Sequence, residues 1–252
     1  MPASREDIIE EVGSVVIVGG GRLGTALSVA IRAAGWSVQG PFGRTDVIPA
    51  TRVAILCVPD ASITGVAKQL PNETILAHCS GALTLAPLAP HEAFSFHPLL
   101  TVTQATTSFT GVSCAVAANG ELARRICERL VRDLGMRPLV VSDEMRGLYH
   151  AAATAASGYL VTVASLAESL MARAGVGREH LLPLAQAAIA NWGRAGSAAL
   201  TGPIVRGDEE TVNDQRRAIA EHSSDALPLW DALTEATRSL VQQSAQLPAR
   251  SE

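Results

Sequence analysis

The tightest constraint on the fold is a run of glycines that follows a short β-branched segment near the start of the chain. The composition of Val15-Val16-Ile17-Val18 is that of a strand buried on both faces. The next residues, Gly19-Gly20-Gly21-Arg22-Leu23-Gly24, fit the spacing G-x-G-x-x-G and open a helical stretch over 22–34. In this order of strand, turn and helix, the spacing predicts a site for the phosphates of a dinucleotide.

The glycines of this segment divide three tasks between them. Gly19 permits the tight turn, Gly21 lets the backbone approach a pyrophosphate, and Gly24 lets the helix pack closely on the sheet. We expect Arg22 and Leu23 to bring free N–H groups of the helix start to the phosphates. The alternative is a tight strand–helix turn that binds nothing.

The choice of dinucleotide rests on the end of the second expected strand, 36–39. An acidic residue there is typical of NAD sites, but Gln39-Gly40 occupies the place and Arg44-Thr45 follows. Because a guanidinium pairs with a 2′-phosphate, we predict NADP(H), although Arg44 could be an ordinary exposed loop residue. Further residues expected to line the cofactor site are Val58, Pro59, Ser80 and His97.

Strands alternate with helices over the first 141 residues, and only helices are expected afterwards. Further strands are expected at 53–58, 74–78, 93–96, 113–116 and 138–141, with a charged amphipathic helix over 121–134. Long helices are expected at about 144–174, 178–199, 209–223 and 227–246. This pattern predicts an α/β domain with a doubly wound parallel sheet over 1–142 and an all-helical domain over 143–252.

Composition excludes several classes of partner. The net charge is −4 and aromatic residues make up only 4%, so we expect no nucleic-acid binding. Cys57, Cys79, Cys114 and Cys127 have no metal-ligand spacing, so we expect reduced thiols and no metal site. The acidic first residues lack the apolar region of a signal peptide, and a cytoplasmic location is expected.

One segment is long enough to cross a membrane. No Asp, Glu, Lys or Arg occurs from Gly147 to Ala167, but small residues dominate and His150 lies inside. We therefore expect no membrane span and a helix buried on nearly all sides, within its domain or at a homodimer interface.

The same helix carries a polar stripe. Arg146, Tyr149, His150, Ala153 and Ser157 fall on one face at helical spacing. We predict that His150 donates a proton, with Tyr149 in reserve, because the unperturbed pKa of His lies near neutrality. Packing of His150 in the core is the alternative.

A second candidate site lies in the helical half. Leu200-Thr201-Gly202-Pro203-Ile204-Val205-Arg206-Gly207-Asp208 places an arginine between glycine-containing turns. Arg206 or Arg146 is expected to hold a substrate carboxylate, unless Arg206 only pairs with Asp208 at the surface. Asn191 could orient substrate, with a helix-surface Asn as the alternative.

These segments, with Phe94-Ser95-Phe96-His97-Pro98-Leu99 and Tyr149-His150-Ala151-Ala152-Ala153, resemble the Rossmann-like DUF2520 oxidoreductase family. In layout that family is similar to pyrroline-5-carboxylate reductase and the 6-phosphogluconate-dehydrogenase-like group, in which a helical dimerisation domain follows the nucleotide-binding domain. One branch is an alternative ketopantoate reductase. Arg146 stands where related dehydrogenases often have a proton-donating Lys, and Gly158 stands where the family often has Asn.

The resemblance and the residues together predict an NADP-dependent oxidoreductase. The expected reaction reduces the C=O or C=N bond of a small carboxylate-bearing compound. One candidate substrate is 2-dehydropantoate. The alternatives are a pyrroline-carboxylate-type imine reductase and a catalytically idle NADP(H)-binding sensor or scaffold.

Overall fold

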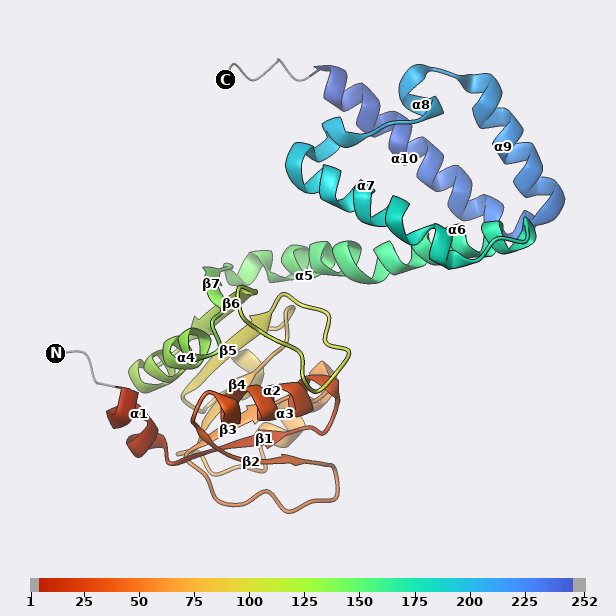
Figure 1. Cartoon of the computed structure of the whole chain (residues 1–252). Helices are drawn as coiled ribbons and strands as arrows, with labels where there is room; N and C mark the ends of the chain where they lie inside the picture. The colour runs from red at the N-terminus through yellow and green to blue at the C-terminus, as the bar shows by residue number, and fades with distance from the viewer. Residues whose placement is uncertain (1–4, 247–252) are drawn as a thin grey trace. The chain divides into compact units, whose positions relative to one another are not determined.

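A computed structural model describes the backbone of residues 5–246 and the side chains of residues 8–243. The chain divides into two compact units, Met1–Ser157 and Gly158–Glu252 (Figure 1). The division falls inside a continuous helical stretch, Asp143–Arg173. The sequence pattern changes earlier, at residue 142, but the first turns of this helix contact the sheet and so count with the first unit.

The first unit is built on one seven-stranded sheet in the order β2-β1-β3-β4-β5-β6-β7. The strands are β1 (Ser14–Val18), β2 (Ser37–Phe42), β3 (Val53–Leu56), β4 (Ile75–His78), β5 (Ala93–Pro98), β6 (Ser113–Ala118) and β7 (Arg137–Val140). The predicted doubly wound α/β architecture is confirmed, with one exception to the parallel order. β5 and β6 pair antiparallel, because the segment between them, 99–112, contains no crossover helix.

Helices cover both faces of this sheet. On one face lie α1 (Arg5–Val12), α2 (Arg22–Ala33) and α4 (Glu121–Asp133), and on the other lies α3 (Asp60–Ala67). Each face has its own apolar cluster, with Leu27 and Ile126 in the first and Ile63 and Leu76 in the second. Strands buried on both faces explain the uninterrupted apolar runs in the sequence.

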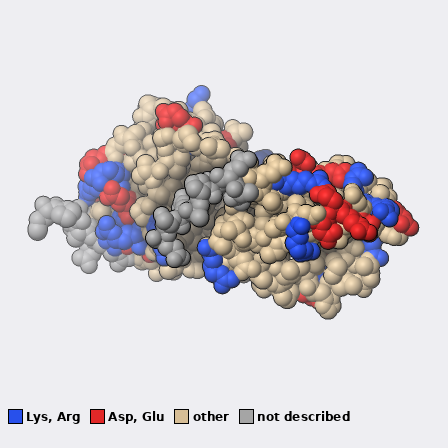
Figure 2. Space-filling view, turned by 90° about the horizontal axis from the view of Figure 1, so that it is seen from above, with Lys and Arg blue, Asp and Glu red and all other residues tan. Residues whose placement is uncertain are grey.

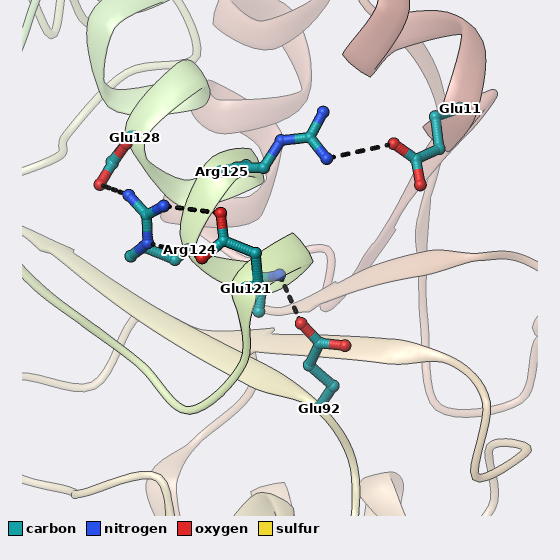
Figure 3. A network of polar contacts seen from close by, with 7 residues as sticks. Glu11, Glu92, Glu121, Arg124, Arg125 and Glu128 are labelled. Carbon is teal, nitrogen blue, oxygen red and sulfur yellow. Dashed lines mark hydrogen bonds and ion pairs between the residues drawn. The ribbon is translucent and has the colours of Figure 1, made fainter. Parts of the chain in front are cut away.

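Polar contacts join α1 and the sheet to α4 (Figure 3). The backbone N–H of Ala123 donates to the Glu92 carboxylate over 2.8 Å, which satisfies a free amide in the first turn of α4. Arg125 of α4 lies 3.7 Å from the carboxylate of Glu11 on α1. These contacts position helices rather than a site.

The remaining helices follow the sheet. They are α5 (Arg146–Thr154), a π turn (Ala155–Tyr159), α6 (Leu160–Arg173), α7 (Leu182–Ala195), α8 (Pro203–Arg206), α9 (Glu209–His222) and α10 (Leu227–Gln246), with single 3-10 turns at Ala86–Leu88, Asp143–Met145, Arg178–His180, Gly196–Ala199 and Ser224–Ala226. The four predicted long helices are present, and the short α8 was not expected. The π turn shifts the helical register, so Ser157 lies outside the regular spacing that the polar stripe assumed.

The second unit has little core of its own. Between residues 158 and 243, the only buried hydrophobic side chains are Val212 and Ile219. Large apolar side chains on α6 and α7 are instead exposed, including Val161, Leu184 and Trp192. An apolar groove of about 570 Å³ runs between Leu160, Val163, Leu182 and Ile189.

Among the described residues, one helical stretch, Asp143–Arg173, is long and apolar enough to cross a membrane. None of its most apolar window is buried in the chain. The expectation that this helix is covered inside its own domain is therefore wrong, since the second unit lacks the bulk to enclose it.

Candidate functional site

The glycine segment lies where the winding of the sheet reverses, between β1 and β3. Ligands of doubly wound sheets bind at this point, beyond the carboxyl ends of the strands. A cavity of about 350 Å³ is present there. It is lined by Val18, Gly19, Gly20, Gly21, Phe42, Gly43, Arg44, Asp46, Ile48, Cys57, Val58, Pro59, Ser62, Val66 and Gln69.

The glycines of this segment have two different surroundings. At Gly24 a Cβ would lie 1.9 Å from the Gly19 carbonyl oxygen, so the close approach of helix and turn requires glycine. A Cβ at Gly20 or Gly21 would meet no atom within 4 Å. These two positions therefore leave open space over the amino end of α2, and Arg22 and the half-buried Leu23 begin that helix. The arrangement fits a pyrophosphate.

The loop after β2 carries both an arginine and an acid. Arg44 lines the cavity, as predicted for a 2′-phosphate, whereas Thr45 is exposed and is not part of the lining. Asp46 also lines the cavity and accepts a hydrogen bond of 2.7 Å from the Gly43 N–H. Asp46 was not predicted from the sequence, because it lies in the loop beyond the strand end, and it shares the cavity lining with Arg44.

A row of polar groups continues along the carboxyl edge of the sheet. Asp60, which follows Pro59 of the cavity lining, accepts a hydrogen bond of 2.7 Å from the Ser80 hydroxyl. The Ser80 oxygen also accepts from the N–H groups of Ala82 and Leu83, so the turn after β4 is fixed. Ser80 thus lies one strand beyond the cavity rather than in its wall.

His97 and Tyr149 meet at the end of β5. The Nδ1 atom of His97 lies 2.8 Å from the Tyr149 hydroxyl, and the two rings are 5.6 Å apart, edge to face. The His150 ring is 6.1 Å from that of His97. A Cβ at Gly81 would lie 2.8 Å from the His150 ring and 2.9 Å from the His97 ring, so glycine lets both imidazoles approach the turn after β4.

Burial sets the charge state of the inner histidines. Burial is the main reason that the pKa of His97 falls to about 4, and the neighbouring His150 and Arg146 add to the shift. Burial also lowers the pKa of His78, which is inaccessible and bonded to the Thr84 carbonyl over 2.9 Å. Both imidazoles are therefore neutral near pH 7. The pKa of Tyr149 is raised, again mainly by burial.

Arg146 lies beneath this group rather than on its surface. The residue is 1% exposed, and its Nη2 donates to the Ser95 hydroxyl over 3.0 Å. Its Nε and Nη1 atoms are buried without a hydrogen-bond acceptor. Contact with a substrate carboxylate, the role predicted from the sequence, is not open to Arg146 in this conformation.

Two further predicted residues of the helical half, Arg206 and Asn191, belong to the second unit. Arg206 is exposed at the end of α8, between Gly202 and Gly207. Asp208 caps α9 by accepting a hydrogen bond of 3.1 Å from the Thr211 N–H, which gives the acid of this segment a structural task. Asn191 is exposed and accepts a hydrogen bond from Arg194. The roles of Arg206 and Asn191 remain predictions.

Four residues of this region were missed from the sequence: Asp46, Asp60, Gly81 and Ser95. Asp60 and Gly81 could have been found, because they follow expected strands whose carboxyl ends share one edge. Ser95 had no such signal, since only the packing of α5 on β5 brings it to Arg146.

Solved structures of the same fold include NADP-dependent enzymes. A proposed NADP oxidoreductase from Bacteroides fragilis has a TM-score of 0.79 and 20% identity, covering 92% of this chain and 99% of its own. A Thermotoga maritima protein has a TM-score of 0.71 and 22% identity, covering 92% and 100%. A reductive aminase from Aspergillus terreus, solved with NADPH and ethyl levulinate, has a TM-score of 0.68 and 19% identity, covering 91% and 98%.

On the face shown in Figure 2, acidic and basic side chains lie next to one another without a large region of one sign.

Sequence comparison gives the family but no characterised relative. No curated protein matches the chain. The model of a domain of unknown function, DUF2520, matches residues 112–237, which is half of the chain. The glycine segment and the matched region thus agree with the predicted resemblance, and the chain belongs to the DUF2520 family.

Proposed function

We propose that the protein is an NADPH-dependent reductase of a small carboxylate-bearing compound with a C=O or C=N bond. One observation carries the proposal. Within the first unit, a glycine-lined cavity and a titratable Tyr149–His97 pair lie along the carboxyl edge of the same sheet. The Asp60–Ser80 hydrogen bond lies along the same edge. A cofactor site next to a proton donor is what a reductase requires.

The first part of the site would hold the cofactor. Gly20, Gly21 and the start of α2 would bind its pyrophosphate, and Arg44 its 2′-phosphate, because these groups offer N–H donors and positive charge beside open space. NADPH, when bound, supplies the hydride. The reductive aminase of the same fold, solved with NADPH, supports this choice.

The second part would supply the proton. Tyr149 is half-buried and its hydroxyl is oriented by His97, whereas His150 is exposed. We therefore place the general acid at Tyr149 and keep His150, the first expectation from the sequence, as the comparison in the test. A neutral His97 can donate through Nδ1 to the phenolate oxygen that forms as the proton leaves.

Two substrate classes separate the general-acid role from positioning. A 2-oxo acid needs a proton on its oxygen as hydride arrives, whereas a cyclic imine that binds already protonated needs none. We expect NADPH oxidation with a panel of 2-oxo acids that includes 2-dehydropantoate. With a 2-oxo acid that the protein reduces, Tyr149→Phe should lower kcat by about 10²–10⁴-fold and change KM less.

His150→Ala is the matched variant and should retain most of the turnover. A larger loss in His150→Ala than in Tyr149→Phe would return the acid to His150. Turnover of cyclic imines alone, unaffected by Tyr149→Phe, would favour an imine reductase. NADPH binding without turnover of either class would favour an idle binding protein.

The proposed assembly is a homodimer formed through the helical unit. Only Val212 and Ile219 form a buried apolar core between residues 158 and 243, and an apolar groove of about 570 Å³ is left open on α6 and α7. A unit this thin gains most of its stability by burying that surface against a second copy. The proposed location is the cytoplasm, where thiols such as the free Cys57 and Cys79 stay reduced.

A further inference from the structure

The Arg146 guanidinium is a buried charge that its own hydrogen bonds do not explain. One N–H group donates to Ser95, while Nε and Nη1 have no acceptor. The Asp143 carboxylate lies 3.4 Å from Nε, and the Asp143 side chain is 63% exposed to water. Burying a charge with so little compensation is costly, and a hydrophobic residue could fill the space more cheaply.

The position of this charge relates it to the proposed acid. Arg146 begins α5, and Tyr149 and His150 lie one helical turn further along the same face. Ser95, its hydrogen-bond partner, lies two residues before His97 on β5. The charge is therefore anchored to both elements that bring Tyr149 and His97 together.

We propose that Arg146 is a positioning residue whose buried positive charge favours the anionic form of Tyr149 and disfavours a proton on His97. In the reductase proposed above, this charge would stabilise the Tyr149 side chain at the moment it gives up its proton. His97 would stay neutral and keep its hydrogen bond to the phenol. The inference rests on the proposed function only for this catalytic consequence.

Other charges around the pair do not replace this effect. Burial and, to a smaller extent, Cys114 of β6 raise the pKa of the Tyr149 phenol, whereas Arg146 lowers it. Around His97, His150 and His78 act in the same direction as Arg146, and Asp60 opposes them. Among these titratable neighbours, Arg146 alone is permanently cationic.

A spectroscopic titration tests the charge without substrate or cofactor. The chain has two tyrosines, so Tyr159→Phe leaves Tyr149 as the only phenol, and Tyr159 is 65% exposed. In this background, Arg146→Met should move the ultraviolet titration of tyrosinate to higher pH, and Arg146→Gln, which keeps a hydrogen-bond donor without the charge, should do the same. Coincident titrations of the parent and Arg146→Met would overturn the proposal.

Ser95→Ala separates charge from packing. It removes the one hydrogen bond of Arg146 and keeps its charge, so the titration should stay near that of the parent. If Ser95→Ala shifts the titration as far as Arg146→Met does, the hydrogen bond rather than the charge positions Tyr149. If Arg146→Met fails to fold, Arg146→Gln keeps the test decisive, since a titration that coincides with that of the parent would contradict the proposal.

The catalytic consequence is measured as kcat at neutral pH. Arg146→Met should lower kcat for a 2-oxo acid on the order of tenfold at neutral pH, and Arg146→Lys should restore most of it. A shifted titration in a protein without any turnover would reject the proposed reductase and leave the electrostatic role of Arg146 standing. A normal titration with normal turnover would reject the role and leave the reductase.

Discussion

At the scale of single residues, the cofactor loop contains opposing charges. Arg44 and Asp46 line the same cavity, and their charges have opposite effects on a 2′-phosphate. The preference for NADPH over NADH therefore depends on which of the two lies nearer the phosphate when the cofactor binds.

Substitution of these two residues measures the preference. Arg44→Ala should weaken NADPH binding roughly ten- to a hundredfold, as expected for a lost hydrogen bond between charged groups, and leave NADH unchanged. Asp46→Asn should strengthen NADPH relative to NADH. Fluorescence titration of both cofactors provides the measurement, and Arg52→Ala, an exposed arginine paired with Glu11, is the control. Tighter binding of NADH than of NADPH by the unaltered protein would contradict the choice of cofactor.

Also at this scale, the half-buried His97 makes stability depend on pH. The unfolded chain takes up a proton near pH 6.5, whereas the folded protein resists protonation until about pH 4. Since the unfolded state binds more protons in that window, the free energy of unfolding should fall as pH drops from about 6.5 toward 4.

Urea unfolding across this window tests the prediction. His97→Asn should flatten the decline, and His180→Asn should not, because the His180 side chain is 66% exposed. The same slope in both variants and the parent would show that His97 titrates normally. The pKa of the buried His78 is lowered as well, so part of the slope should persist in His97→Asn.

At the scale of elements, different glycines of the turn between β1 and α2 should affect stability and cofactor binding. Gly24→Ala should lower the free energy of unfolding by about 1–3 kcal/mol, because its Cβ would overlap the Gly19 carbonyl. Gly21→Ala should leave stability nearly unchanged, since its Cβ would meet no atom within 4 Å, yet it should weaken NADPH binding by about tenfold or more.

Thermal unfolding and cofactor titration of the same variants compare the two effects. Gly65→Ala on α3 is the matched control, because its Cβ also meets nothing within 4 Å and it does not line the cavity. Unchanged NADPH affinity in Gly21→Ala would mean that the backbone at this glycine does not face the pyrophosphate.

At the scale of the whole molecule, the proposed homodimer would cover the apolar groove of the helical unit. Sedimentation should show a dimer at micromolar concentration, and the unfolding midpoint should rise with protein concentration. Val163→Glu and Leu184→Glu, at exposed positions along the groove, should give monomers. Val29→Glu, at an exposed apolar position on α2, should stay dimeric. A monomeric wild-type protein would contradict the assembly.

The sequence by itself determined the doubly wound sheet, the glycine turn and the change to helices, because each is encoded in local patterns of apolar residues, glycine and proline. It also placed Tyr149 and His150 together on one helix face. Local patterns do not record which side chains meet across elements. Only the tertiary structure paired Tyr149 with His97, buried Arg146 against Ser95 and brought Asp46 to the cofactor cavity. It also left the apolar face of α6 uncovered, because burial depends on the bulk of neighbouring helices and not on the helix itself.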